Sequence, residues 1–214
     1  MSRRTRQTRI TVINDGPRHA THTLLLAHGA GAGMGSEFMR TVATGLGDSG
    51  IRVTRFEFPY MTRTTETGVR RPPDHETVLR ECWQEVIHAF PAETLVIGGK
   101  SLGGRIASLV ADEMPVAGLV CLGYPFHPAG RPDRLRTAHL QTLRVPTLIL
   151  QGERDRLGNK HEVATYALSD RIQVQWLTDG DHDLVPRKRS GRTRQHNWDQ
   201  AVRMTAEFIL HLPL

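Results

Sequence analysis

Cysteine is scarce in this 214-residue chain, which contains only Cys82 and Cys121. The first falls in an expected helix and the second in an expected strand, and their spacing is typical of neither a disulfide framework nor a zinc site. We therefore expect two free, buried thiols. The Asp181-His182-Asp183 run is no better as a metal site, because neighbouring loop residues rarely converge on one ion. No metal is expected.

Long apolar runs are also absent, since no stretch approaches the roughly 18 residues that a membrane-spanning helix requires. The first nine residues are basic, but they lack the apolar segment and the small-residue cleavage site of a secretory signal. These absences favour a cytoplasmic protein without a membrane span. Residues 1–8 are expected to form a flexible basic arm on a single domain that covers residues 1–214, because the length suits one domain.

Basic residues outnumber acidic ones, at 28 against 22, for a formal net charge of +6. Much of the excess lies in the N-terminal arm and in residues 187–194. Neither segment carries the aromatic interleaving or the motif of a nucleic-acid module. We interpret both as solvated segments and expect no specific nucleic-acid partner.

Apolar, β-branched runs alternate with amphipathic segments along the chain, which indicates an α/β fold with a mostly parallel sheet flanked by helices. Two Pro-containing stretches, 59–73 and 124–144, are expected to be irregular loops at the carboxyl edge of the sheet, where open α/β folds place ligands. The second is too short for a separate lid domain. Expected strands cover residues 9–13, 23–27, 52–56, 94–98, 118–122, 147–151 and 173–177, and expected helices cover 36–48, 75–89, 104–112, 160–167 and 198–211.

The most informative motif is Gly99-Lys100-Ser101-Leu102-Gly103. It follows an apolar strand and runs straight into a helix-forming segment, which is the context of a nucleophile elbow. Glycine two residues before and after the serine allows strand and helix to approach closely. A phosphate-binding loop would require glycine five residues before Gly99, where Thr94 stands. We predict that Ser101 is a nucleophile.

An elbow serine requires a base and an orienting acid, which should follow it along the chain. His182 lies in a turn-rich loop between a strand and the last helix, and His196 is its nearby competitor. Asp155 follows the strand that ends near Gln151, with Glu153 as its competitor. The predicted order is Ser101, Asp155, His182, in which the histidine takes the proton of the serine and the aspartate fixes the histidine tautomer.

Two backbone N–H groups should stabilise the oxyanion. Leu102, directly after the nucleophile, is one candidate. The Gly-rich loop that follows the strand 23–27 supplies the other, with Ala30 as first choice and Gly29 as second. His28 in this loop is expected to be a structural hydrogen-bonding residue rather than a base.

The chain resembles the α/β-hydrolase superfamily over residues 23–212. Within it, the sequence looks like the small lid-less branch related to dienelactone hydrolases and to the hydrolase-like subunit of a nuclear histone-acetyltransferase complex. The resemblance implies Ser101, Asp155 and His182 as the triad, with no cofactor, and dienelactone hydrolases differ in having a cysteine nucleophile. The matching segments are Leu26-Ala27-His28-Gly29-Ala30-Gly31-Ala32, Phe58-Pro59-Tyr60-Met61, Gly98-Gly99-Lys100-Ser101-Leu102-Gly103-Gly104-Arg105, Gly123-Tyr124-Pro125-Phe126-His127-Pro128 and Gln151-Gly152-Glu153-Arg154-Asp155.

Gly29, Tyr60 and Tyr124 lie within these matches and are expected to line the substrate site. The leading hypothesis is a serine hydrolase, of esterase or thioesterase type, that acts on a small-molecule ester or thioester. Arginines in residues 59–73 and 187–194 would surround the cleft with positive charge and favour an anionic substrate. The alternative is a non-catalytic interaction protein with the same fold, since fold and function are separable. Only the first hypothesis requires Ser101 to be unusually nucleophilic.

Overall fold

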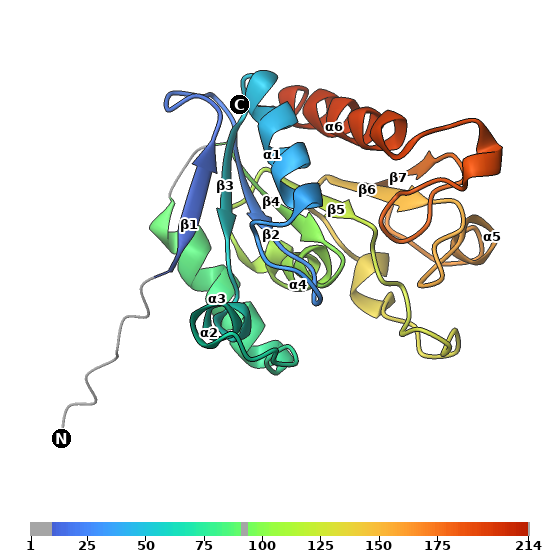
Figure 1. Ribbon diagram of the computed structural model, residues 1–214, viewed down its shortest axis with the longest axis horizontal. Helices are drawn as coiled ribbons and strands as arrows, with labels where there is room; N and C mark the ends of the chain where they lie inside the picture. Colours follow the sequence, from blue (N-terminus) through green and yellow to red (C-terminus); the bar gives the residue numbers. More distant parts are fainter. Residues whose placement is uncertain (1–9, 91–93, 214) are drawn as a thin grey trace.

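A seven-stranded sheet with helices on both faces forms the body of the protein (Figure 1). The computed structural model describes residues 10–90 and 94–213. The strand order is β1-β3-β2-β4-β5-β6-β7, and only the β1–β3 pair is antiparallel. This sheet confirms the expected α/β class. The strands are β1 (Val12–Asp15), β2 (Thr23–Ala27), β3 (Arg52–Phe56), β4 (Leu95–Lys100), β5 (Gly118–Leu122), β6 (Thr147–Gly152) and β7 (Ile172–Leu177).

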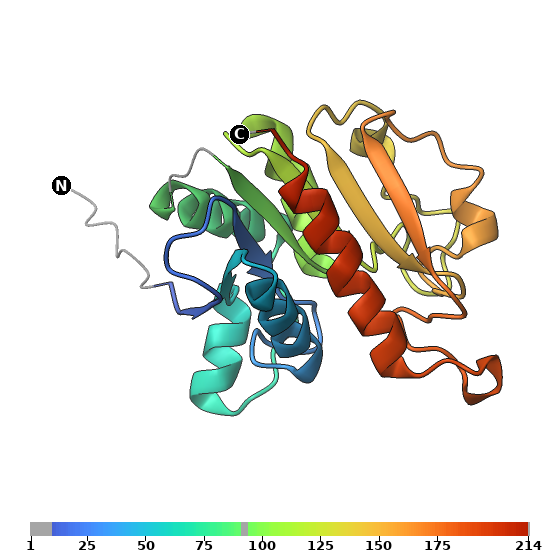
Figure 2. The same cartoon turned by 90° about the horizontal axis from the view of Figure 1, so that it is seen from above.

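Helices cover both faces of the sheet, which explains why its central strands are continuous apolar runs. The longer helices are α1 (Glu37–Asp48), α2 (Pro59–Thr67), α3 (Glu76–Ala89), α4 (Leu102–Val110) and α6 (Arg194–Leu210); α5 (Lys160–Val163) and the 3-10 turns Ala111–Glu113, Ala138–Gln141 and Lys188–Ser190 are short. α1 and α6 lie side by side over one face (Figures 1 and 2). Their side of the core contains Phe38 and Trp198, whereas Trp83 and Ile106, from α3 and α4, belong to the core on the other side. No helix of the described segments is long and apolar enough to cross a membrane.

The first strand differs from the expectation of residues 9–13. Residue 9 lies outside the described residues, as does the arm 1–8. β1 runs from Val12 to Asp15 because its polar end bonds to β3: Thr54 Oγ1 donates to Asn14 Oδ1 at 2.7 Å, and Arg55 Nε donates to Asp15 Oδ2 at 2.8 Å. Polar cross-strand pairs therefore extend this edge strand beyond residue 13, where the apolar pattern alone predicted its end.

Residues 59–67 form α2, so the expectation of an irregular loop over 59–73 is wrong for its first part. Proline at the first helical position and left-handed Gly68 at the end are favourable start and stop residues. Threonines, which are poor helix formers, bond back to the preceding turn here, as when Thr64 Oγ1 donates to Tyr60 O at 2.9 Å. Burial of Tyr60 and Met61 supplies the remaining stabilisation.

The last helix begins at Arg194, four residues before the expected start. Thr193 caps it, and the side chain of His196 returns the bond, with Nδ1 accepting from Thr193 N at 3.3 Å. This capping box explains the early start. The fourth expected helix, 160–167, is instead limited to Lys160–Val163. The stretch 124–144 is irregular as expected, apart from one 3-10 turn.

Candidate active site

Ser101 occupies the sharp turn between β4 and α4, with a positive φ of 50°. Positive φ is strained for a residue with a side chain and is typical of functional turns. Its backbone N–H donates to Leu122 O at 3.0 Å, which ties the turn to β5. A Cβ added to Gly99 or to Gly103 would lie 2.6 Å from the carbonyl oxygen of Ala27. Both glycines are therefore required by close backbone approach.

The three residues predicted to form the triad lie together. His182 Nε2 is 2.8 Å from Ser101 Oγ, and His182 Nδ1 is 2.7 Å from Asp155 Oδ2. Asp155 is completely buried, whereas the side chain of His182 is 28% exposed. The carboxylate end of this arrangement is therefore shielded from solvent, and the end with the serine is accessible.

Asp155 is held by donors on both of its oxygens. Leu157 N donates to Oδ1 at 2.8 Å, and Gln151 Nε2 lies 2.9 Å from Oδ2. Gln151 is fully buried and also binds the backbone of Tyr124, so it joins the acid to the next loop. Sequence reasoning missed this residue. An amide in an otherwise apolar strand, Thr-Leu-Ile-Leu-Gln, is the signal that could have found it.

The competing candidates have other partners. Glu153 forms an ion pair with Lys160 at 2.9 Å and accepts from Asp179 N at 2.9 Å. The bond from the Asp179 backbone, followed by the bond from Lys160, lowers the pKa of Glu153. His196 belongs to the cap of α6. Neither residue is bonded to Ser101 or His182 within the described part of the chain.

The Gly-rich loop after β2 lies against the nucleophile, because a Cβ added to Gly29 would lie 3.6 Å from Ser101 Cβ. Among the described residues, the backbone N–H groups of Ala30 and Leu102 have no hydrogen-bond acceptor. His28 Nδ1 lies 2.7 Å from Gly29 O, and His28 Nε2 accepts from Phe58 N at 3.1 Å. Burial lowers the pKa of His28 to about 4. Neutral His28 thus joins this loop to the start of α2.

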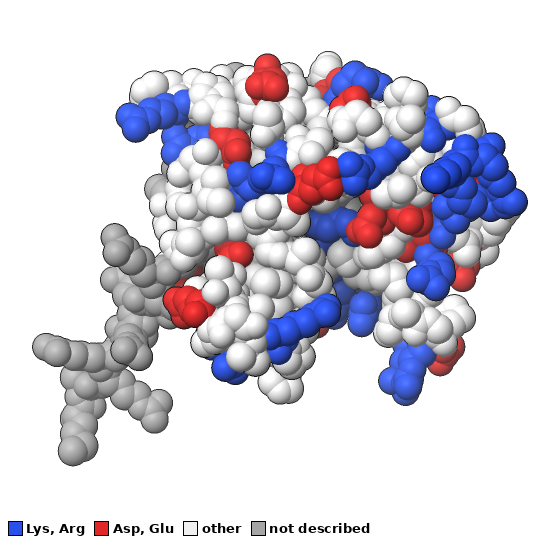
Figure 3. Space-filling view, viewed as in Figure 1, with Lys and Arg blue, Asp and Glu red and all other residues white. Residues whose placement is uncertain are grey.

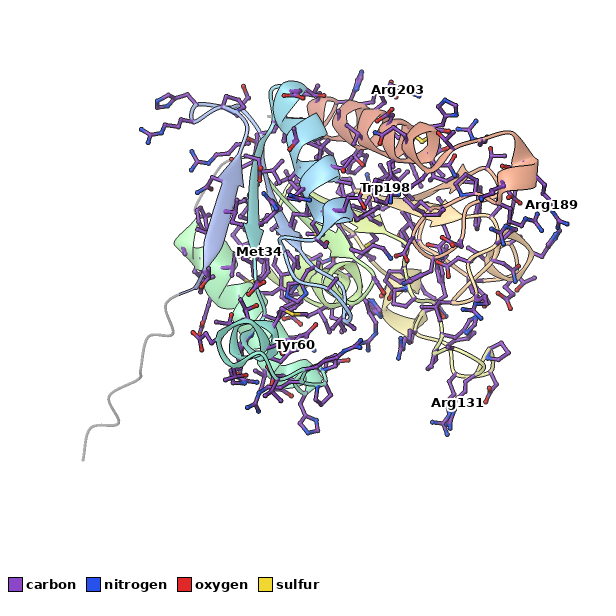
Figure 4. All side chains as sticks on the ribbon, in the orientation of Figure 1. Met34, Tyr60, Arg131, Arg189, Trp198 and Arg203 are labelled. Atoms are coloured by element: carbon purple, nitrogen blue, oxygen red, sulfur yellow. The ribbon has the colours of Figure 1, made fainter. Side chains whose placement is uncertain are left out.

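Tyr60 and Tyr124 are both fully buried, so their side chains are not open to solvent, and the expectation that these residues line the substrate site stays a prediction. Tyr60 lies in α2 (Figure 4), and its hydroxyl donates to Gly29 O at 3.1 Å. The Tyr124 hydroxyl donates to Arg136 O at 3.0 Å. Burial raises the pKa of both phenols, so they remain neutral donors. Each hydroxyl thus holds the backbone of a neighbouring loop in place.

Arginines from both expected basic segments line cavities beside residues of the proposed site. Arg70 and Arg71 line a cavity of about 290 Å³ together with Ala30 and Gly31. From the run 187–194, Arg187 lines a second cavity, of about 810 Å³, together with Asp155. Further Lys and Arg side chains gather at one end of the molecule (Figure 3), where Arg189 lies (Figure 4). Within that run, Arg187 pairs with Asp179 and Arg194 pairs with Glu37. Both segments therefore place an arginine beside the site, and the ion pair of Arg187 with Asp179 leaves less of its charge available to a substrate.

Within residues 10–90 and 94–213, no group of three or more His, Cys, Asp or Glu side chains is arranged to hold a metal ion. Both cysteines are buried and free.

Solved structures of similar fold cover almost the whole chain. A dienelactone hydrolase from Anabaena variabilis shares 19% identity, covering 97% of this chain and 94% of its own, with a TM-score of 0.72. A serine hydrolase without a lid from Xanthomonas campestris shares 19% identity over 96% of this chain and 90% of its own, with a TM-score of 0.68. An alpha-beta serine hydrolase homologue from Coxiella burnetii shares 18% over 92% and 90%, also at 0.68. At these identities the likeness concerns the fold.

The family comparison is more specific. The model of the family described as "Alpha/beta hydrolase domain" matches residues 20–210, which include β2 and its Gly-rich loop, the elbow, and the loops of Asp155 and His182. This chain therefore belongs to the alpha/beta hydrolase domain family.

Proposed function

We propose that this protein is a serine hydrolase that cleaves a carboxylic ester or thioester through a Ser-His-Asp triad. The observation that carries the proposal is the continuous hydrogen-bond chain from Ser101 Oγ through His182 to buried Asp155, with both distances below 3 Å. A serine hydroxyl becomes nucleophilic when a positioned base can take its proton, and an acid on the far ring nitrogen keeps the correct tautomer.

The reaction begins when Ser101 Oγ attacks the carbonyl carbon while His182 Nε2 takes the hydroxyl proton. The carbonyl oxygen becomes an oxyanion, for which the N–H groups of Ala30 and Leu102 are the proposed donors; removal of one such donor typically costs about 2.7 to 4 kcal/mol. Collapse expels the alcohol or thiol, which receives the proton from His182. Water then attacks the acyl-enzyme by the same proton transfers, releasing the acid and restoring Ser101.

The proposed oxyanion donors must already point at the site, because preorganised donors need no reorganisation during the reaction. The carbonyl of Gly29 is already bonded to His28 and to Tyr60, so it is turned away from the proposed oxyanion site. The N–H of the same peptide group, on Ala30, has no partner in the described chain. Tyr60 and His28 are thus proposed as positioning residues for the oxyanion loop.

Covalent labelling tests the proposal. The purified protein should react rapidly with a fluorophosphonate, and peptide mass spectrometry should locate the adduct on Ser101. Ser108 is the matched control, since it too has a histidine at 2.8 Å but is buried, and it should remain unlabelled. A well-folded protein that gives no adduct would contradict the hydrolase proposal, and the non-catalytic interaction protein would then stand.

An anionic substrate is supported by Arg70 and Arg71, which share a cavity with Ala30. Neither guanidinium has a hydrogen bond or an ion pair to a described side chain. A substrate held with its carbonyl at Ala30 could extend a carboxylate or phosphate into this cavity. Charge-assisted bonds from arginine to such groups are among the stronger ones in proteins.

Replacing both Arg70 and Arg71 by alanine should raise KM for a 4-nitrophenyl ester of glutaric acid by about tenfold, which corresponds to about 1.4 kcal/mol. KM for the uncharged 4-nitrophenyl pentanoate should not change. The difference should shrink at high salt, because exposed charges are screened. Arg189→Ala, which removes a distant exposed arginine, is the control. Equal effects on both esters would argue against an anion subsite.

A further inference from the structure

Lys100 is the last residue of β4 and the covalent neighbour of Ser101, yet its side chain points into the protein and only 7% of the residue is exposed. Its ammonium donates to the backbone carbonyl of His182 at 2.8 Å and pairs with Asp183 at 3.2 Å. The ammonium also lies 5.8 Å from the centre of the Phe38 ring. Among the described residues, every hydrogen bond and ion pair of this ammonium is thus made to the loop that carries His182.

Burial of this charge is unfavourable by itself. Lysine is almost never fully buried unless it is paired, and a buried ion pair is often less stabilising than an apolar side chain of the same volume. Burial lowers the pKa of Lys100, whereas Asp183, Asp155 and Asp181 act in the opposite direction and favour the charged ammonium. A contribution to the stability of the fold therefore does not explain why a lysine occupies this position.

In the loop that carries His182, other groups hold the neighbouring residues, whereas Lys100 holds the backbone of His182 itself. Residues on either side are fixed by other groups: Asp181 N donates to Val185 O, and Trp198 Nε1 donates to Asp183 O. Among the described residues, Lys100 is the only group bonded to the backbone of His182. The imidazole is held separately, by Asp155 and Ser101.

These contacts close a small ring. It runs from Ser101 Oγ to His182 Nε2 at 2.8 Å, through His182 to its carbonyl, across 2.8 Å to Lys100 Nζ, and back along the chain to Ser101. A shift of the histidine loop relative to β4 would lengthen one or both of these bonds. The position of the imidazole is thus fixed from the strand that carries the serine.

We infer that Lys100 is a positioning residue for the proposed hydrolysis: its ammonium holds the backbone of His182 so that Nε2 stays within hydrogen-bond distance of Ser101 Oγ. This inference rests on the proposed function for its kinetic consequence, but its structural part concerns the imidazole alone. Lys100 acts through His182 and has no contact with the reacting carbonyl in this role.

Lys100→Met removes the ammonium and keeps an unbranched apolar chain of similar length. With 4-nitrophenyl acetate, kcat should fall by about 100-fold, the effect of a misplacement of about 1 Å, while KM changes by less than about twofold. The low-field proton resonance of the His182–Asp155 hydrogen bond should weaken or disappear. Lys160→Met, which removes a surface lysine with its own ion pair, should leave kcat, KM and the resonance as in the wild type.

Circular dichroism establishes that each variant is folded, and Lys100→Gln, whose amide is too short to reach the carbonyl, replaces Lys100→Met if the latter does not fold. Wild-type kcat and an unchanged resonance in the folded variant would overturn the inference while the hydrolase proposal stands. A wild-type protein without turnover would contradict the hydrolase proposal, and the resonance would still decide whether Lys100 positions His182.

Discussion

Alanine at Ser101 and alanine at His182 should each lower kcat for a simple 4-nitrophenyl ester by about 10⁶-fold, and the double variant should be no slower than either single one. The reason is that the two groups act as one unit. Without His182 the hydroxyl of Ser101 keeps its proton, and without Ser101 the imidazole has no nucleophile to activate. Their 2.8 Å contact is the physical basis of this non-additivity.

Steady-state kinetics of the two single variants and the double variant measure this directly. His196→Ala is the matched control, because His196 is the nearby histidine that caps α6, and its loss should affect thermal stability without affecting kcat. Losses that multiply in the double variant would mean that Ser101 and His182 act independently. That result would contradict the proposed triad.

Asp155→Asn should lower kcat by about 10⁴-fold with little change in KM. Both carboxylate oxygens accept from donors: Oδ1 from Leu157 N, and Oδ2 from Gln151 and His182. An asparagine must direct its own NH₂ group at one of these donors. When it faces His182, the imidazole carries its proton on Nε2 and cannot accept the proton of Ser101.

The matched control is Glu153→Gln, at the competing acidic position in the same loop. Glu153 bonds to Lys160 and to the Asp179 backbone, so its amide variant should keep kcat within about threefold, as expected when an ion pair near the surface is lost. A large loss in Glu153→Gln together with a small loss in Asp155→Asn would reverse the proposed assignment of the acid. Thermal unfolding of both variants would exclude a general loss of structure.

The central strands could be predicted closely because their apolar pattern is set by burial on both faces. β2, β3 and β5 have the expected bounds, and β4 and β6 differ by one or two residues. The edge strand β7 differs by one residue, because it alternates between more and less buried positions. The edge strand β1 was less predictable, since polar bonds to Thr54 and Arg55 decide where it ends. Local pattern is informative where burial dominates and weaker where specific pairs dominate.

α2 shows how tertiary structure can override local preference. Its sequence, Pro-Tyr-Met-Thr-Arg-Thr-Thr-Glu-Thr, is rich in β-branched threonine, which disfavours a helix. The burial of Tyr60 against the loop of Gly29 offsets that preference, and this contact joins residues 31 positions apart. A prediction made from neighbouring residues alone could not include this contact.

The order of the residues along the chain predicted the candidates for the triad, and the structure brings these residues together. What the sequence could not supply is how those residues are held. Gln151 and Lys100 each bond to a loop remote in sequence, and the Lys100 contact joins positions 82 residues apart. Such roles depend on the directions of side chains at strand ends, which only the assembled sheet determines.

The separation of the proposed triad along the chain has a consequence for biosynthesis. Ser101 and His182 are 81 residues apart, so at typical translation rates the serine is synthesised about 4 to 16 seconds before the histidine. During that interval its hydroxyl is expected to be an ordinary alcohol, because His182 has not yet been made. The nascent chain is thus expected to be inert toward esters, and reactivity at Ser101 would report that folding has reached the far edge of the sheet.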